Sequence, residues 1–157
     1  MDTIAVSPAI HHTSIRVATA SPTAFVDLTE HLQAFVDGIR LRSGLLTVQT
    51  RHTTTGIIVN EHEPRLLEDF RELLERLTPT DAEYRHDTAP ARDGQPPDAE
   101  RRNGHAHCRA LLLPTSAGLT VIDGRLQLGR WQRVFLLELD DPQEREVSVL
   151  AVGECRS

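Results

Sequence analysis

The dipeptide Asp123-Gly124 constrains the fold more than any other short stretch of this sequence. It separates LTVI from RLQL, and an Asp-Gly pair between two such apolar segments is typical of a two-residue β-hairpin. We therefore expect paired antiparallel strands at residues 119–122 and 125–128. A hairpin at this position makes the last third of the chain part of an antiparallel sheet.

Further segments have the β-branched residues or the alternation that are typical of strands. They lie at residues 13–19, 44–50, 56–60, 132–139 and 145–152. The strands at 44–50 and 56–60 are expected to be neighbours, with His52 in the polar break between them. The segment DDPQE separates the last two strands and indicates antiparallel connections through the C-terminal half.

Helices are predicted where apolar residues recur at spacings of three and four. The first follows the turn residues SPT and ends near Gly38. Its apolar face consists of Phe25, Leu28, Leu32, Phe35 and Ile39. The second is PRLLEDFRELLERL, residues 64–77, which starts with a proline. Because helices and strands do not alternate strictly, we expect an α+β fold class with a mainly antiparallel sheet.

The composition limits the classes of function and partner. A chain of 157 residues suits one core, so residues 1–157 are expected to form a single domain. The net charge is -6 and no lysine is present, which excludes lysine Schiff-base chemistry and argues against nucleic-acid binding. Cysteine is sparse, and the sequence shows neither a signal-peptide pattern nor an apolar run of membrane-spanning length. We therefore expect a cytoplasmic protein without membrane contact.

Four histidines stand out by their position. Residues 78–102 predict a long loop, either a lid or a segment without fixed structure, that contains His86 and is followed by His105 and His107. His52 lies at a strand junction. Three neutral imidazoles with an open fourth position are typical of a catalytic zinc centre. Scattered histidines equally suit a polar surface, because they lack the specificity of a compact metal motif.

The stretch NGHAHCRALLL predicts a short helix with Asn103 as its N-cap. Positions two residues apart on a helix differ in direction by about 200°, so His105 and His107 cannot both face one site if they lie on a helix. We favour His107 as the ligand. The alternative is a solvated first helical turn.

Two carboxylates are candidates to support an imidazole. Glu61 in VNEHE and Asp69 in LLEDF lie at the end of a strand and in the following helix, where they are expected to meet His52. Either would orient the ring or act as a general base. The alternative is a charged helix start, favoured by the helix dipole.

The patches HTTTGIIVNEHEP, NGHAHCRALLL and DGRLQLGRWQRVFLLELDDP follow one another in this order, and Arg145 comes after them. Together they resemble the motifs of the YjbQ-like family of small bacterial and archaeal proteins. The resemblance runs from about residue 12 to 152, nearly the whole chain. Members of this family are often described as secondary thiamine-phosphate synthases.

The resemblance implies a sandwich-like α+β subunit with two or three helices, a homotrimer, and a metal site near the subunit contacts. The implied metal ligands are His52, His86 and His107, and the implied catalytic residues behind them are Glu61, Asp69 and Asn103. Imidazoles suit zinc better than Mg²⁺, which is the ion expected for a thiamine-phosphate synthase. The expected ligand is a small anionic or phosphorylated molecule.

The sequence departs from the family pattern in two places. Thr55 stands where the family commonly has alanine, and Gln143 stands where it commonly has arginine. The missing arginine puts an anion contact from that turn in doubt, and Arg145 is the candidate to replace it.

Three functions are compatible with these residues. The first is weak thiamine-phosphate synthase activity, in which a divalent ion and arginines neutralise a diphosphate leaving group. The second is metal-dependent hydrolysis of a small molecule, with Glu61 or Asp69 moving the proton. The third is non-enzymatic binding of a small ligand by a trimer.

Overall fold

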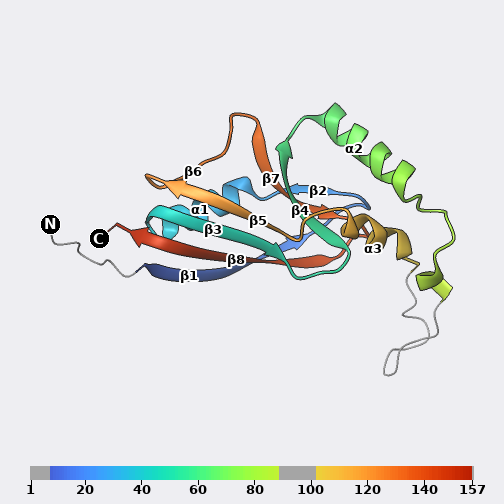
Figure 1. Cartoon of the computed structure of the whole chain (residues 1–157), viewed down its shortest axis with the longest axis horizontal. Coiled ribbons are helices and arrows are strands. Elements are labelled where there is room, and N and C mark those ends of the chain that lie inside the picture. The colour runs from blue at the N-terminus through green and yellow to red at the C-terminus, as the bar shows by residue number, and fades with distance from the viewer. Residues whose placement is uncertain (1–7, 89–101, 157) are drawn as a thin grey trace, which may run out of the picture.

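The computed structural model describes residues 8–88 and 102–156, which form two β-sheets with helices around them (Figure 1). The strands are β1 (Ala9–Ala18), β2 (Phe25–Asp27), β3 (Leu41–Thr50), β4 (Thr55–Glu61), β5 (Ser116–Ile122), β6 (Arg125–Leu126), β7 (Gln132–Glu138) and β8 (Glu144–Cys155). The helices are α1 (Thr29–Gly38), α2 (Pro64–Leu77) and α3 (Gly104–Leu111), and a short 3-10 helix, η1, spans Arg85–Thr88.

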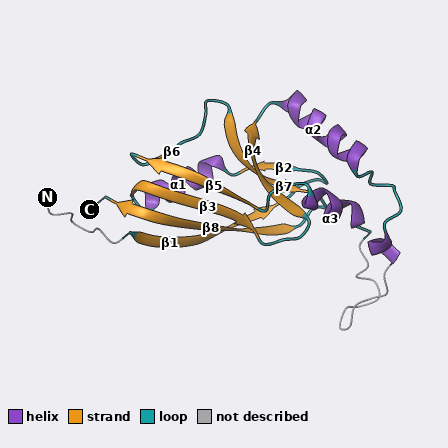
Figure 2. Ribbon diagram, in the orientation of Figure 1, coloured by secondary structure: helices purple, strands orange, loops and turns teal. Residues whose placement is uncertain are grey.

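The strand pairs in the described residues are all antiparallel. The larger sheet has the order β1-β8-β3-β5-β6, and the smaller sheet has the order β2-β7-β4 (Figure 2). The expected α+β class, with antiparallel sheets in a sandwich-like subunit, is therefore confirmed. Among the described segments, none of the helices has the length and apolar character needed to cross a membrane.

The main core lies between the larger sheet and a second layer made of α1 and the smaller sheet. Its fully buried members include Leu32 and Val36 from α1, Leu46 and Val149 from the larger sheet, and Leu136 from the smaller sheet. Burying a side chain of this size stabilises the fold by roughly 1.5–3 kcal/mol. The shared core therefore holds the ends of β3, β4, β7 and β8 in fixed positions.

A smaller apolar cluster attaches α2 and α3 to the second sheet. It is formed by Leu74 of α2, Ala106 of α3, and Phe135, Leu137 and Leu139 in and after β7. Only Leu67 and Leu74 of α2 are buried, so much of its apolar stripe stays accessible. Figure 1 shows α2 standing away from the main body, whereas α3 lies against the ends of the strands.

The predicted hairpin is confirmed. Val121 pairs with Leu126, and Ile122 pairs with Arg125. The two turn residues Asp123 and Gly124 have φ values of 51° and 81°, as a turn of type I′ requires. The second strand is shorter than predicted, because β6 ends at Leu126.

The first helix starts later in the structure than the sequence predicted. Phe25–Asp27 forms strand β2, which pairs with β7, and the helix starts at Thr29. The Asp27 carboxylate accepts a hydrogen bond from the backbone N–H of Thr29, so it marks the start of the helix. Phe25 has helical spacing to the apolar residues of α1, but it lies in a strand and not in the helix.

The strands predicted at residues 44–50 and 56–60 were expected to be neighbours, but they lie in different sheets. β3 belongs to the larger sheet and β4 to the smaller one, so the turn that contains His52 joins the two layers. β7 and β8 are divided in the same way. Both crossings lie at one end of the sandwich, and polar residues gather there.

Candidate functional site

Two of the three predicted metal ligands lie side by side. The ring of His86, from η1, and the ring of His107, from α3, have centroids 4.6 Å apart and meet edge to face at 68°. His86 is exposed and His107 is half-buried, so the pair is accessible from solvent.

Close packing fixes η1 against the start of α3. The carboxylate of Asp87 accepts a hydrogen bond of 2.8 Å from the backbone N–H of Gly104. A Cβ atom at Gly104 would lie 2.4 Å from the Cβ of Tyr84, so only glycine fits there. These two contacts place His86 next to His107.

Asn103 occupies the N-cap position of α3 without capping the helix through its side chain. Its amide nitrogen instead donates to the buried Asp140 carboxylate at 2.9 Å. Asn103 is therefore the N-cap residue, as predicted, but the side chain that accepts a hydrogen bond from the start of the helix is that of Asp87. Asn103 ties α3 to the turn between β7 and β8, because Asp140 lies in that turn.

A buried ion pair stands behind the site. The Arg145 guanidinium contacts both carboxylate oxygens of Glu138, which has an exposed fraction of 0%. The hydroxyl of Thr19 donates to the same carboxylate, and Arg145 also donates to the hydroxyl of Thr54. The Arg145 guanidinium therefore binds Glu138. This geometry does not support the expectation that Arg145 replaces the arginine missing at position 143 as an anion contact.

His52 lies in the turn between β3 and β4. Its Nε2 accepts a hydrogen bond of 2.9 Å from the backbone N–H of Glu146, which requires an unprotonated Nε2. Burial lowers the pKa of His52, and the nearby positive charge of Arg145 lowers it further. His52 is therefore a neutral ring whose Nε2 is occupied by the hydrogen bond from Glu146.

The predicted three-histidine set is only partly assembled. In the segments described, no group of three or more His, Cys, Asp or Glu side chains is arranged to hold a metal ion. The structure brings His86 and His107 together, whereas His52 is bonded to β8. The adjacent pair fits a metal ion as two nitrogen donors, and a complete centre needs further ligands.

His105 points to a different side of α3 from His107, as expected for two positions on a helix. It has an exposed fraction of 8%, and its Nδ1 is buried without a hydrogen-bond partner. Its ring lies 6.4 Å from that of Tyr84. Burial lowers the pKa of His105, and the charge of Arg109 adds to this effect. His105 is therefore neutral in the fold.

Glu61 and Asp69 lie away from the histidine pair within the subunit. β4 starts at Thr55, beside the turn of His52, and Glu61 is its last residue. Seven residues at about 3.3 Å each place these ends about 20 Å apart. Asp69 follows on the exposed side of α2. The expected approach of Glu61 to His52 is therefore not made within one chain, and the catalytic roles of Glu61 and Asp69 stay predictions.

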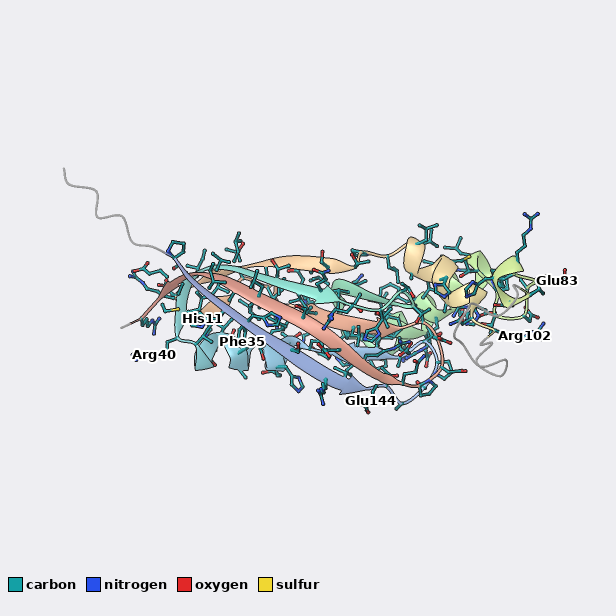
Figure 3. All side chains as sticks on the ribbon, turned by 90° about the horizontal axis from the view of Figure 1, so that it is seen from below. His11, Phe35, Arg40, Glu83, Arg102 and Glu144 are labelled. Atoms are coloured by element: carbon teal, nitrogen blue, oxygen red, sulfur yellow. The ribbon has the colours of Figure 1, made fainter. Side chains whose placement is uncertain are left out.

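A polar pocket adjoins the histidine pair. It has a volume of about 500 Å³ and is lined by residues 80–85, 87 and 88 together with Arg102. Its charged lining residues are Asp81, Glu83, Arg85, Asp87 and Arg102. Figure 3 shows Arg102 and Glu83 at this end of the molecule, far from Arg40 at the other end.

The sequence interpretation missed a second cluster of ionisable groups. One oxygen of Asp27 accepts hydrogen bonds from Arg133 at 2.8 Å and from His62 at 3.1 Å. Burial alone would raise the pKa of Asp27, but these bonds and those from Thr29 lower it to about 2. No local signal could have found this cluster, because Asp27 and Arg133 are 106 residues apart.

Comparisons with known proteins agree with the architecture. Residues 13–154 match a family described as UPF0047 protein YjbQ-like. A UPF0047 protein of Archaeoglobus fulgidus is 37% identical over 138 residues, covering 88% of this chain and 98% of that protein. A UPF0047 protein of Methanothermobacter thermautotrophicus is 33% identical over 145 residues, covering 92% of this chain and 94% of that protein.

Solved structures are similar over the same length. A YbjQ-like protein of unknown function from Sulfolobus solfataricus superposes with a TM-score of 0.83 at 30% identity, covering 94% of this chain and 99% of that one. A hypothetical protein from Aeropyrum pernix gives a TM-score of 0.80 at 33% identity, covering 92% and 99%. The fold is therefore shared across the full length of these relatives.

Proposed function

Because this chain belongs to the UPF0047 YjbQ-like family, we propose that it is a metal-dependent enzyme acting on a small phosphorylated molecule. The observation that carries the proposal is the contact between His86 and His107. His86 is exposed and His107 is half-buried, so two imidazoles that meet edge to face are open to a ligand from solvent. Zinc is the proposed ion, because imidazole nitrogen suits it better than Mg²⁺.

Each residue of the proposed centre has a defined task. His86 and His107 would hold the ion through ring nitrogens, and His52 is the predicted third ligand, which would first have to release the N–H of Glu146. Asn103 keeps α3 in place through Asp140. The ion, when bound, supplies Lewis acidity to a phosphate or carbonyl oxygen.

Two guanidinium groups of the adjoining pocket are suited to a phosphorylated substrate. Arg85 and Arg102 line it together with the carboxylates of Asp81, Glu83 and Asp87, and guanidinium groups match phosphate oxygens with paired hydrogen bonds. Such groups would stabilise a diphosphate leaving group, as the thiamine-phosphate synthase reaction requires. This supports the coupling of hydroxymethylpyrimidine diphosphate to thiazole phosphate as the first activity to assay.

Metal-dependent hydrolysis is the weaker alternative. It needs a general base near the ion, and Asp87 is already bonded to the backbone of Gly104. Glu61 and Asp69 belong to the far end of β4 and to α2. A carboxylate from another copy of the chain would be required.

We also propose a homotrimer that buries the open side of α2 and α3. Leu73, Leu77, Leu111 and Leu112 have exposed fractions between 45% and 85%. An apolar groove of about 360 Å³, lined in part by Phe70 and Pro114, lies beside them. Large exposed apolar patches mark interaction sites in soluble proteins.

The oligomer is tested by light scattering on the full chain. The double variant Leu73→Gln, Leu77→Gln is expected to dissociate a trimer, because it removes apolar area from the contact. Leu45→Gln is the matched control, since Leu45 is 60% exposed on the larger sheet. A wild-type monomer, or equal effects of both changes, would overturn the trimer.

The metal site is tested by elemental analysis of protein purified without a histidine tag, followed by zinc titration of the apo-protein. His86→Ala and His107→Ala should each weaken zinc binding by at least about tenfold, because each removes one ligand. His12→Ala is the control, since His12 is an exposed histidine of β1 that bonds to Ser148. Unchanged zinc affinity in both site variants would refute the metal centre.

The activity is tested by pyrophosphate release from hydroxymethylpyrimidine diphosphate in the presence of thiazole phosphate. Turnover should require the added ion and be lost in His107→Ala. If the metal binds but no pyrophosphate is formed, the synthase reaction is excluded. A panel of phosphate esters under the same conditions then tests the hydrolase.

A further inference from the structure

A second pocket lies at the opposite end of the molecule from the histidine pair. It has a volume of about 340 Å³, near the lower end of small-molecule sites. Its lining residues are Val36, Asp37, Arg40, Leu41, Asp123, Gly124, Arg125 and Arg156. Leu41 begins β3, and the turn of His52 follows the end of that ten-residue strand, so about 30 Å separate the pocket from that turn.

The pocket is positively charged in an acidic protein. Arg40, Arg125 and Arg156 contribute three guanidinium groups, against the two carboxylates of Asp37 and Asp123. The whole chain carries a net charge of -6, so the positive charge of this pocket is opposite in sign to that of the chain. The C-terminal end of α1 adds a partial negative charge of about half a unit, which does not cancel a guanidinium.

The walls of the pocket are tied together by hydrogen bonds. Gln33 of α1 donates to the carbonyl of Gly124 at 2.9 Å and to the Asp37 carboxylate at 2.8 Å. Arg156 is paired with β3 through its backbone N–H, which donates to the carbonyl of Arg40 at 2.9 Å. Segments far apart in the sequence are thus held in one arrangement.

The arginine side chains are also positioned. Arg156 donates to the carbonyl of Asp123 at 3.1 Å, and its guanidinium lies beside Gly124, 3.6 Å from the place of a Cβ atom. Arg40 has a φ of 55°, because it is the left-handed residue that follows the C-cap of α1, Ile39.

We propose that this pocket binds a small oxyanion-bearing molecule, such as a sugar phosphate. Guanidinium groups from β6 and from the end of β8 hold the anionic group through paired hydrogen bonds. The carboxylates of Asp37 and Asp123 accept hydrogen bonds from hydroxyl groups of the same ligand. The site does not depend on the metal centre and goes beyond the proposed reaction.

The test is titration of the full chain with inorganic phosphate, glucose 6-phosphate and citrate at low ionic strength, followed by calorimetry. Arg125→Gln and Arg156→Gln should each weaken binding by about tenfold, because each removes a charge-assisted contact. Arg42→Gln is the control, since Arg42 is a nearby exposed arginine paired with Glu154. Tighter binding of the phosphates or of citrate identifies the anionic group.

A second measurement does not rely on variants. In the amide spectrum of the wild-type chain, phosphate should shift the signals of Gly124 and Arg125, whether or not the pocket beside His107 also binds phosphate. Removing the metal with a chelator should not alter this binding, which separates it from the proposed catalytic centre. Unsaturable binding, or equal weakening by Arg42→Gln, would overturn the site.

Discussion

The carboxylate of Glu138 and the guanidinium of Arg145 form a paired contact that is closed to solvent, although the two residues belong to different sheets. Glu138 ends β7 and Arg145 is the second residue of β8. The pair therefore joins the layers at the end where His52 and Asn103 lie. Hydrogen bonds to Glu138 from Thr19 and from the backbone of Asp140 compensate for the loss of water.

Removing the positive member of this pair should be costly. Arg145→Met leaves the Glu138 carboxylate buried without its main partner, and we expect the free energy of unfolding to fall by about 3–5 kcal/mol. Urea denaturation at pH 7 measures the loss. Arg51→Met is the control, because the Arg51 pair with Glu146 is largely exposed and should change stability by less than about 1 kcal/mol. Similar losses in both variants would show that Glu138 does not need its partner.

Acid should weaken the fold through Asp27. Its pKa in the folded chain is about 2, below its ordinary value of 3.8, so its stabilising contribution is complete above pH 4 and is lost as the pH falls through 2. Asp27→Asn should therefore cost about 1–2 kcal/mol at pH 7 and much less near pH 2. Urea titrations across this range measure the difference. A loss that is independent of pH would contradict the role of the charge.

His105 predicts a second dependence on pH in a higher range. Its pKa is lowered from 6.5 by burial and by Arg109, so the folded chain resists protonation more than the unfolded chain does. Stability should be complete above pH 6.5 and decline as the pH falls below that value. In His105→Leu this part of the decline should disappear. Melting temperatures between pH 8 and pH 5 measure the change, and parallel curves for the two proteins would rule it out.

Local patterns in the sequence predicted those parts of the fold that depend on neighbouring residues. The helix predicted at residues 64–77 is present as Pro64–Leu77, and Glu63 caps it by accepting from two backbone N–H groups. The hairpin at Asp123-Gly124 forms because both positions adopt positive φ. In each case the signal and the structure involve the same few residues.

Long-range partners explain what the sequence could not predict. Phe25 appeared helical by spacing, and only its pairing with β7 makes it a strand. Asn103 is a residue type that commonly caps helices, yet its side chain donates a hydrogen bond to Asp140, which is 37 positions away. The contact of His86 with His107 was expected from the family motifs, whereas the bond of His52 to the backbone of Glu146 has no signature in the sequence.

Two glycines lie opposite each other on neighbouring strands of the larger sheet. Gly44 of β3 pairs directly with Gly153 of β8, next to an irregular register between Leu41 and Ser43. A Cβ atom on Gly153 would lie 2.2 Å from the carbonyl oxygen of Ser43 and 2.7 Å from the Cα of Gly44, so the strands must separate to accept one. Gly153→Ala should therefore destabilise the chain by about 1–3 kcal/mol.

The matched control for that substitution is Gly118→Ala in β5, where an added Cβ meets no atom within 4 Å. That change should stabilise the chain by roughly 0.5–1 kcal/mol, because alanine loses less backbone entropy on folding than glycine does. Urea midpoints of the two variants, compared with wild type, should move in opposite directions. Movement in the same direction would mean that the close approach of β3 and β8 does not determine the choice of glycine at 153.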